Sequence, residues 1–157
     1  MLSDVIKPEN IVIDLESTDK DVLFAEMIEA LVRLYPSIDR DEALAALEDR
    51  ECKANTCVMP GIAVPHAGCR SVQETVAVLG ISRDGVDYEV SGGAADGSPL
   101  VHVVVMLLFE LGNAERHLQI LADCASVLRV PEFYRSVLSA KSAQDVCSVI
   151  RECEAEY

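Results

Sequence analysis

The chain has 157 residues, of which half are hydrophobic and a quarter are charged, so it can bury a core and is not expected to be disordered. Its 27 acidic and 13 basic residues give a formal net charge of −14, which disfavours binding to nucleic acid or to an anionic membrane surface. The same charge favours a basic protein partner, or else it serves only to keep the protein soluble.

The sequence shows no targeting segment and no membrane-spanning stretch. The N-terminus has neither a basic region nor an apolar signal region, and the longest apolar run, 100–109, is too short for a transmembrane helix. We therefore expect a cytoplasmic protein that forms a single domain over residues 1–157.

The first third of the chain predicts one strand and two helices. The run 11–15 is typical of a strand, and residues 17–19 supply side-chain oxygens that can cap a helix. That helix carries apolar residues at helical spacing and ends before Pro36. The second helix is predicted to begin at Asp39 and to run to about Arg50.

The middle of the chain predicts short strands. An apolar triplet at 62–64 indicates a buried strand that Pro65 ends, and 76–81 indicates another. Asp84 and Gly85 form a strong turn signal, so residues 86–88 are expected to pair back as a short strand.

The last part predicts a loop at 92–97, a strand at 100–108 that is apolar on both faces, and then helices. These helices are 115–128 with Asn113 as its cap, about 132–140, and a last helix capped by Ser142. Strands alternating with amphipathic helices favour a three-layer α/β domain.

The six cysteines do not form a recognisable site. They are Cys52, Cys57, Cys69, Cys124, Cys147 and Cys153. There is no CxxC pair, and a cytosolic chain of this size needs no disulfide, so we expect free thiols, with Cys124 and Cys147 buried in helices. Cys57, His66 and Cys69 are the one combination that suggests a metal, and their spacing fits no known site, so no cofactor or metal is expected.

His66 is the histidine with the most defined setting. It follows Pro65 at the end of an apolar strand, where ligands collect in α/β sheets, and small residues come after it. No serine–base pair or carboxylate pair accompanies it, which suits an imidazole that acts as a nucleophile itself. The alternative is an ordinary surface histidine.

Three other side chains complete the set of candidates. His102 lies inside a strand and is expected to be a hydrogen-bonded structural histidine. His117 lies at the N-terminal end of a predicted helix, where an anion is favoured, and Arg50 precedes the loop leading to His66, where a guanidinium would suit a phosphoryl group. Taken alone, Arg50 is better explained as a solvated charge at a helix end, and His117 as a side chain that caps a helix.

Together these segments resemble the fructose/mannitol-type enzyme IIA domains of the bacterial phosphotransferase system, which include a nitrogen-regulatory branch. The motif GIAVPH at 61–66 is similar to the family's phosphorylation site. The segments that resemble further family motifs, in the family's order, are 2–11, 49–51, 85–88, 95–100 and 117–122.

The resemblance implies an α/β sandwich with a mixed central sheet and helices on both faces. It implies that His66 accepts a phosphoryl group from the carrier protein HPr or an HPr paralogue, with His117 and Arg50 beside it to hold the phosphate. In sugar-transporting members the phosphoryl group then passes to a cysteine of a IIB domain.

This chain departs from the family pattern on both sides of the motif. Cys57, Met59 and Pro60 precede it where glycines or a polar residue are usual, and Gly68 lies where a basic residue or threonine is common. Residues 109–113 are also unusual. Two functions stay open: a carrier that feeds sugar uptake, and a regulator whose phosphorylation state is read by a protein target.

Overall fold

A mixed β-sheet forms the centre of the fold in the computed structural model, which describes residues 1–89 and 100–156. Its strands are β1 (Ile11–Val12), β2 (Cys57–Met59), β3 (Ile62–Ala63), β4 (His66–Gly68), β5 (Val76–Asp87) and β6 (Leu100–Phe109). The strand order is β1–β5–β6–β3–β2, and β4 pairs with β6 further along the edge that β3 occupies. The β5–β6 and β2–β3 pairs are antiparallel, whereas β1, β3 and β4 run parallel to their partners.

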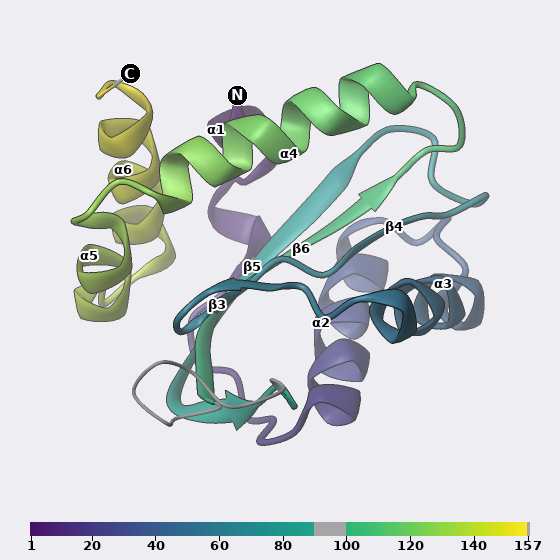
Figure 1. The fold of residues 1–157 in the computed structure, drawn as a ribbon, viewed down its shortest axis with the longest axis horizontal. Coiled ribbons are helices and arrows are strands. Elements are labelled where there is room, and N and C mark those ends of the chain that lie inside the picture. The colour runs from purple at the N-terminus through teal and green to yellow at the C-terminus, as the bar shows by residue number, and fades with distance from the viewer. Residues whose placement is uncertain (90–99, 157) are drawn as a thin grey trace.

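Helices cover both faces of this sheet (Figure 1). They are α1 (Leu2–Val5), the short 3-10 helix η1 (Pro8–Asn10), α2 (Lys20–Leu34), α3 (Arg40–Lys53), α4 (Ala114–Leu128), α5 (Phe133–Ser139) and α6 (Ala143–Glu154). One buried cluster lies between the sheet and α2 and α3, and the other lies between the sheet and α1, α4, α5 and α6. The expected α/β sandwich with helices on both faces is therefore confirmed.

β6 is the strand that holds the two layers together. Val103 and Val105 pack into the cluster under α4, while Val104 and Met106 pack into the cluster under α2 and α3. Alternate residues of a strand point to opposite faces, so a strand that is apolar at every position can serve both clusters. The sequence predicted this double burial for 100–108.

Local capping signals decide where three of the helices begin. The side chains of Asp19, Asp39 and Ser142 each accept a hydrogen bond from the backbone N–H three residues later. Asn113 stands at the N-cap of α4, but it has left-handed backbone angles and makes no capping hydrogen bond through its side chain. The prediction of Asn113 as a side-chain cap is therefore wrong.

The hairpin predicted at Asp84 and Gly85 is also wrong. β5 runs through both residues. Val86 pairs with Val101 of β6, and β6 is also the strand that pairs with the first half of β5. The ladder is irregular between Ile81 and Val86, where Gly85 adopts φ +95° and donates its N–H to the Ser82 hydroxyl. Asp84 and Gly85 therefore lie in a bulge rather than a hairpin turn, because β6 is long enough to pair with the β5 residues on both sides of them.

Smaller differences concern element ends. β1 is limited to Ile11–Val12, although the Leu15 N–H still bonds to the Ile81 carbonyl at the sheet edge. The predicted loop at 92–97 lies outside the described residues. Among the helices that the structure describes, none combines the length and the apolar character needed to cross a membrane.

Candidate functional site

His66 is held at the start of a short edge strand. The chain leaves β3 at Ala63, passes through Pro65 and enters β4 at His66, which pairs with Leu107 of β6. The Pro65 carbonyl accepts a hydrogen bond from the Leu107 N–H at 3.0 Å, and the Val64 N–H donates to the Thr56 carbonyl at 2.9 Å. The backbone on the N-terminal side of the imidazole is thus fixed by two neighbouring segments.

A single hydrogen bond defines the chemistry of the His66 ring. Nδ1 lies 2.8 Å from the Val64 carbonyl oxygen, which can only accept a hydrogen bond. Nδ1 must therefore carry the proton and donate it. In the neutral imidazole this leaves the lone pair on Nε2, which is the nucleophilic nitrogen.

The surroundings of His66 keep its imidazole neutral. Burial is the largest effect and lowers the pKa of His66, and the positive charge of Arg50 lowers it further. The hydrogen bond to Val64 and the charge of Glu51 act in the opposite direction but do not cancel these effects. A neutral ring retains the lone pair that a nucleophile needs.

Arg50 lies in the last turn of α3 and is half-buried. Its Nη1 donates a hydrogen bond to the Ala54 carbonyl at 2.9 Å, which anchors the guanidinium near the end of the helix. The positive charge of its guanidinium contributes to lowering the pKa of His66, so the two predicted site residues interact electrostatically. Within the described residues, no other hydrogen bond occupies the guanidinium.

His117 is oriented by a ring and by a carboxylate. Its imidazole stacks on Phe109 with a centroid separation of 4.4 Å and an interplanar angle of 14°. Phe109 also meets the His66 ring edge-on, at 6.2 Å between centroids. One phenyl ring therefore contacts both histidines, while His117 Nε2 lies 2.8 Å from Oε1 of Glu110 rather than against His66.

Sequence reasoning missed Phe109, Glu110 and the hydroxyl of Thr75 that bonds to Glu110. The one available signal was that 109–113 departs from the pattern of similar proteins. His102 and the cysteines behave more simply. His102 bonds to the Ser82 carbonyl at 2.9 Å, as expected of a structural histidine, and Cys124 and Cys147 are buried as predicted.

The metal site considered at Cys57, His66 and Cys69 has no support among the described residues. Among residues 1–89 and 100–156, no group of three or more His, Cys, Asp or Glu side chains could hold a metal ion. Cys69 instead forms hydrogen bonds with Glu42 and Ser71. Burial raises the pKa of the Cys124 thiol to about 12, which disfavours the thiolate form that binds metals.

An apolar surface surrounds the exposed edge of His66. A hollow of about 280 Å³ is lined by His66 together with Val58, Met59, Val64, Leu121, Cys124, Ala125, Leu128 and Arg129. Three large apolar side chains are exposed: Val58, which lines this hollow, Leu111, which follows Glu110, and Leu118, which follows His117. We refer to these three residues as the apolar rim. Exposed apolar groups gathered at one place are typical of a protein-binding surface.

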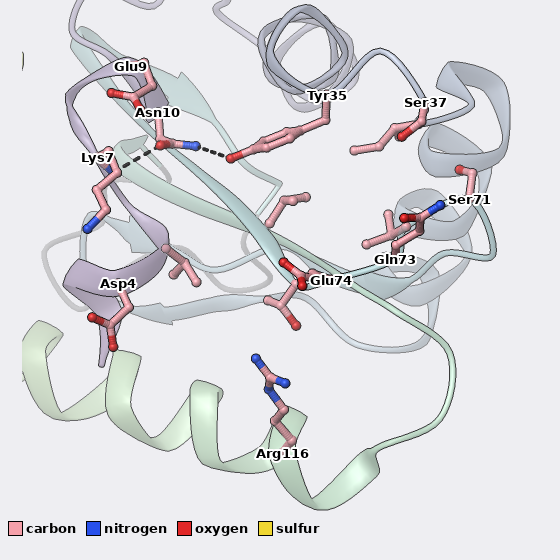
Figure 2. A pocket seen from close by; sticks show the side chains of 15 residues that line it. Asp4, Lys7, Glu9, Asn10, Tyr35, Ser37, Ser71, Gln73, Glu74 and Arg116 are labelled. Atoms are coloured by element: carbon pink, nitrogen blue, oxygen red, sulfur yellow. Dashed lines mark hydrogen bonds between the residues drawn. The ribbon is translucent and has the colours of Figure 1, made fainter.

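A larger hollow, of about 730 Å³, is polar and does not include His66 (Figure 2). The Asn10 amide donates to the Tyr35 hydroxyl at 3.0 Å on one side of it, and Arg116 reaches into it from α4 on the other. Its lining includes both acidic and basic side chains. It is relevant to the site because Arg116 and Thr75 both line it.

Comparison with known proteins gives one family. The family model described as phosphoenolpyruvate-dependent sugar phosphotransferase system, EIIA 2, matches residues 4–153. The fructose-specific EIIABC component of Bacillus subtilis is 30% identical over 96% of this chain, which spans only 23% of that relative's length. The fructose-specific EIIA component of Haloferax volcanii is 35% identical over 73% of this chain and 71% of its own length.

Solved structures share the fold. The nitrogen regulatory protein IIA-Ntr of Neisseria meningitidis superposes with a TM-score of 0.84 at 24% identity, covering 95% of this chain and 98% of its own. Mannitol IIA of Escherichia coli gives a TM-score of 0.75 at 20% identity, covering 92% of this chain and 97% of its own.

Proposed function

The chain belongs to the EIIA 2 family of the phosphoenolpyruvate-dependent sugar phosphotransferase system, and from this premise we propose that it carries a phosphoryl group on Nε2 of His66. The donor in this proposal is phosphohistidine of HPr or an HPr paralogue. The acceptor is a cysteine of a IIB component. In this proposal the relay operates in the cytoplasm.

The hydrogen bond from His66 Nδ1 to the Val64 carbonyl is the observation that carries the proposal. It leaves Nε2 as the unprotonated nitrogen, and the lowered pKa of His66, due mainly to burial, keeps that nitrogen free of a proton. An unprotonated, partly exposed ring nitrogen is what phosphoryl transfer requires of an acceptor.

The chemistry of the proposed step is a direct displacement. The Nε2 lone pair forms a bond to phosphorus while the bond between phosphorus and the donor imidazole breaks, and the donor nitrogen keeps that electron pair. The onward step is analogous, with a thiolate of the IIB component as the attacking group. Such transfers depend on positioning and on charge stabilisation more than on covalent machinery.

Arg50 and His117 have the supporting roles in this proposal. The charge of Arg50 reaches His66, and a guanidinium suits the equatorial oxygens of a phosphoryl group. His117 and His66 both lie against the Phe109 ring, so His117 is a second candidate donor to those oxygens.

The apolar rim supports transfer between proteins. Val58, which lines the hollow at His66, is exposed, as are Leu111 and Leu118. An apolar contact of this kind can exclude water while two active sites meet. The fold neighbour described as a complex of enzyme IIAMTL and phosphorylated enzyme IIBMTL from Escherichia coli gives a precedent for a IIB partner.

A regulatory role is the second candidate. The nitrogen regulatory protein of Bradyrhizobium diazoefficiens is 26% identical over 95% of this chain and 94% of its own length. In that role the phosphorylated and free forms of His66 would be distinguished by a protein target. Neighbouring genes separate the two roles: a gene for a membrane IIC component favours transport, and its absence favours regulation.

Intact-mass measurement tests the proposed carrier function. Incubation with phosphoenolpyruvate, enzyme I and HPr should add one acid-labile phosphate to the wild type and none to His66→Ala. His102→Ala is the matched control and should react like the wild type, because that ring is bonded to Ser82. A His66→Ala protein that still gains the phosphate would show that the acceptor is another residue.

A further inference from the structure

The carboxylate of Glu110 lies against the imidazole of His117. Its Oε1 is 2.8 Å from His117 Nε2 and 2.9 Å from the hydroxyl of Thr75, which donates to it. The side chains of His117 and Glu110 are only 15% and 12% exposed, so solvent competes little for this contact.

The β-sheet brings these three side chains together. Val76, at the start of β5, pairs with Leu108 near the end of β6, so Thr75 lies next to the residues that follow β6. Glu110 follows β6, and His117 lies in the first turn of α4. Two strand ends and a helix N-terminus therefore converge at one carboxylate.

The carboxylate of Glu110 is in the form that can only accept hydrogen bonds. Burial acts to raise the pKa of Glu110 and is the largest single influence on it. The hydrogen bonds from His117 and Thr75, with a smaller contribution from the charge of Arg116, outweigh burial and lower that pKa. An ionised carboxylate needs a donor opposite it, so Nε2 of His117 carries a proton.

We propose that Glu110, held by Thr75, is a positioning residue that fixes the tautomer and the orientation of His117 for its role beside the phosphorylated histidine. Nε2 donates to Glu110, and within the described residues Nδ1 has no hydrogen-bond partner, so Nδ1 is the nitrogen that faces the phosphoryl group. It donates to a phosphoryl oxygen when the ring takes up a second proton on Nδ1, and Glu110 balances the positive charge that this creates. This inference rests on the proposed function of His66.

Phe109 gives the arrangement its precision. The phenyl ring is stacked on His117 and also packs against His66 in a T-shaped arrangement. Phe109 therefore orients the plane of the His117 ring relative to the His66 ring. Stacking alone would leave His117 free to rotate within its plane, and the bond to Glu110 removes that freedom. A carboxylate behind a working histidine commonly has this function.

The first test is spectroscopic and does not depend on phosphate. In protein labelled with ¹⁵N-histidine, ring correlation spectra should show a proton fixed on Nε2 of His117 in the wild type. That signature should be lost in Glu110→Ala and kept in Glu110→Gln, because the amide oxygen can still accept. Thr75→Val, which keeps the side-chain shape, should weaken the signature. A wild-type His117 without a proton on Nε2 would overturn the proposal.

The second test is the rate at which phospho-HPr labels His66. Glu110→Ala should be about tenfold to a hundredfold slower than the wild type. Glu110→Gln should stay closer to the wild type than to Glu110→Ala. The matched control is Glu132→Gln, an exposed acid paired with Arg135 at the start of α5, which should react at the wild-type rate.

A double variant separates positioning from a merely structural effect. If Glu110 acts through His117, then Glu110→Ala should add nothing to the loss already caused by His117→Ala. Independent, multiplying losses would overturn the proposal, as would a Glu110→Ala protein that reacts at the wild-type rate. Absence of labelling in the wild type would instead reject the proposed function, and the spectroscopic result would still decide whether Glu110 fixes His117.

Discussion

The ammonium of Lys20 lies 3.0 Å from Oε1 of Glu51, with the two side chains only 11% and 6% exposed. The same ammonium lies over the Tyr88 ring, 4.4 Å from its centroid. Thr56 donates to the Glu51 carboxylate from both its backbone N–H and its hydroxyl. The carbonyl of Thr56 in turn accepts from the Val64 N–H, so this buried network supports the segment that carries His66.

The first prediction concerns the stability of this buried ion pair. Lys20→Met should lower the free energy of unfolding by about 3 kcal/mol, because it leaves the Glu51 carboxylate buried without its counter-charge. Lys53→Met is the matched control. The Lys53–Asp49 pair is 74% exposed at both ends, so its loss should cost less than about 1 kcal/mol. Urea unfolding of both variants tests the difference, and equal stability would show that the buried pair contributes little.

Much of the fold follows from local sequence signals. Asp19, Asp39 and Ser142 cap the helices where expected, and the continuous apolar run of β6 correctly predicts a strand covered on both faces. These features depend on residues within a few positions of one another. The pairing of β5 depends on a distant strand, so the Asp84–Gly85 signal was interpreted as a hairpin when it forms a bulge.

The site shows the same division between local and distant information. The Pro65–His66 sequence marks the end of a strand locally, and the family motif singles out Arg50 and His117. Nothing local indicates that Lys20 meets Glu51 from another helix. The Glu110–His117 contact is also hidden, because it forms only when the segment after β6 folds back toward the N-terminus of α4.

The second prediction concerns the titration of His66. Burial lowers the pKa of this imidazole below the ordinary value of 6.5, so the ring should stay neutral at pH 6.5 and gain a proton only in more acidic solution. Protonation takes up the Nε2 lone pair, so the rate of phosphorylation should fall as the pH drops through the pKa of His66 and be flat above it. An NMR titration of the isolated protein checks this directly. A midpoint at or above 6.5 would contradict it.

Arg50 offers a control within the same experiment. Its charge contributes to the lowering of the His66 pKa, so Arg50→Ala should move the titration of His66 toward higher pH. Arg33→Ala removes a basic residue in the last turn of α2 and should leave the titration unchanged. An equal shift in both variants would indicate a general charge effect rather than a specific one.

The third prediction concerns the two supporting residues. Arg50→Ala and His117→Ala should each slow the labelling of His66 by phospho-HPr, on the order of a hundredfold, since each removes a donor aimed at developing charge. The phosphate should remain on His66 in both variants, as peptide mapping under neutral conditions would show. If both variants react at the wild-type rate, the proposed pocket is wrong, provided that circular dichroism shows both to be folded.

The fourth prediction concerns how the donor protein finds the site. The net charge of −14 includes a group of exposed acids on α3, Asp41, Glu48 and Asp49, and the same helix ends at Arg50. A donor with a basic docking face would be attracted to this surface, and salt screens such attraction over about 8 Å at physiological ionic strength. The second-order rate of transfer from HPr should therefore fall as salt is raised, while the single-turnover step at saturating donor changes little.

Two kinds of variant separate this electrostatic attraction from apolar docking. Replacing Asp41, Glu48 and Asp49 with their amides should flatten the salt dependence, because the charges that attract the donor are gone. Leu118→Ala, in the apolar rim, should weaken docking at every salt concentration without changing the slope, because the contact it removes carries no charge. A wild-type transfer rate that is flat from low to high salt would mean that the rim alone guides docking. The acidity of the chain would then serve only to keep the protein soluble.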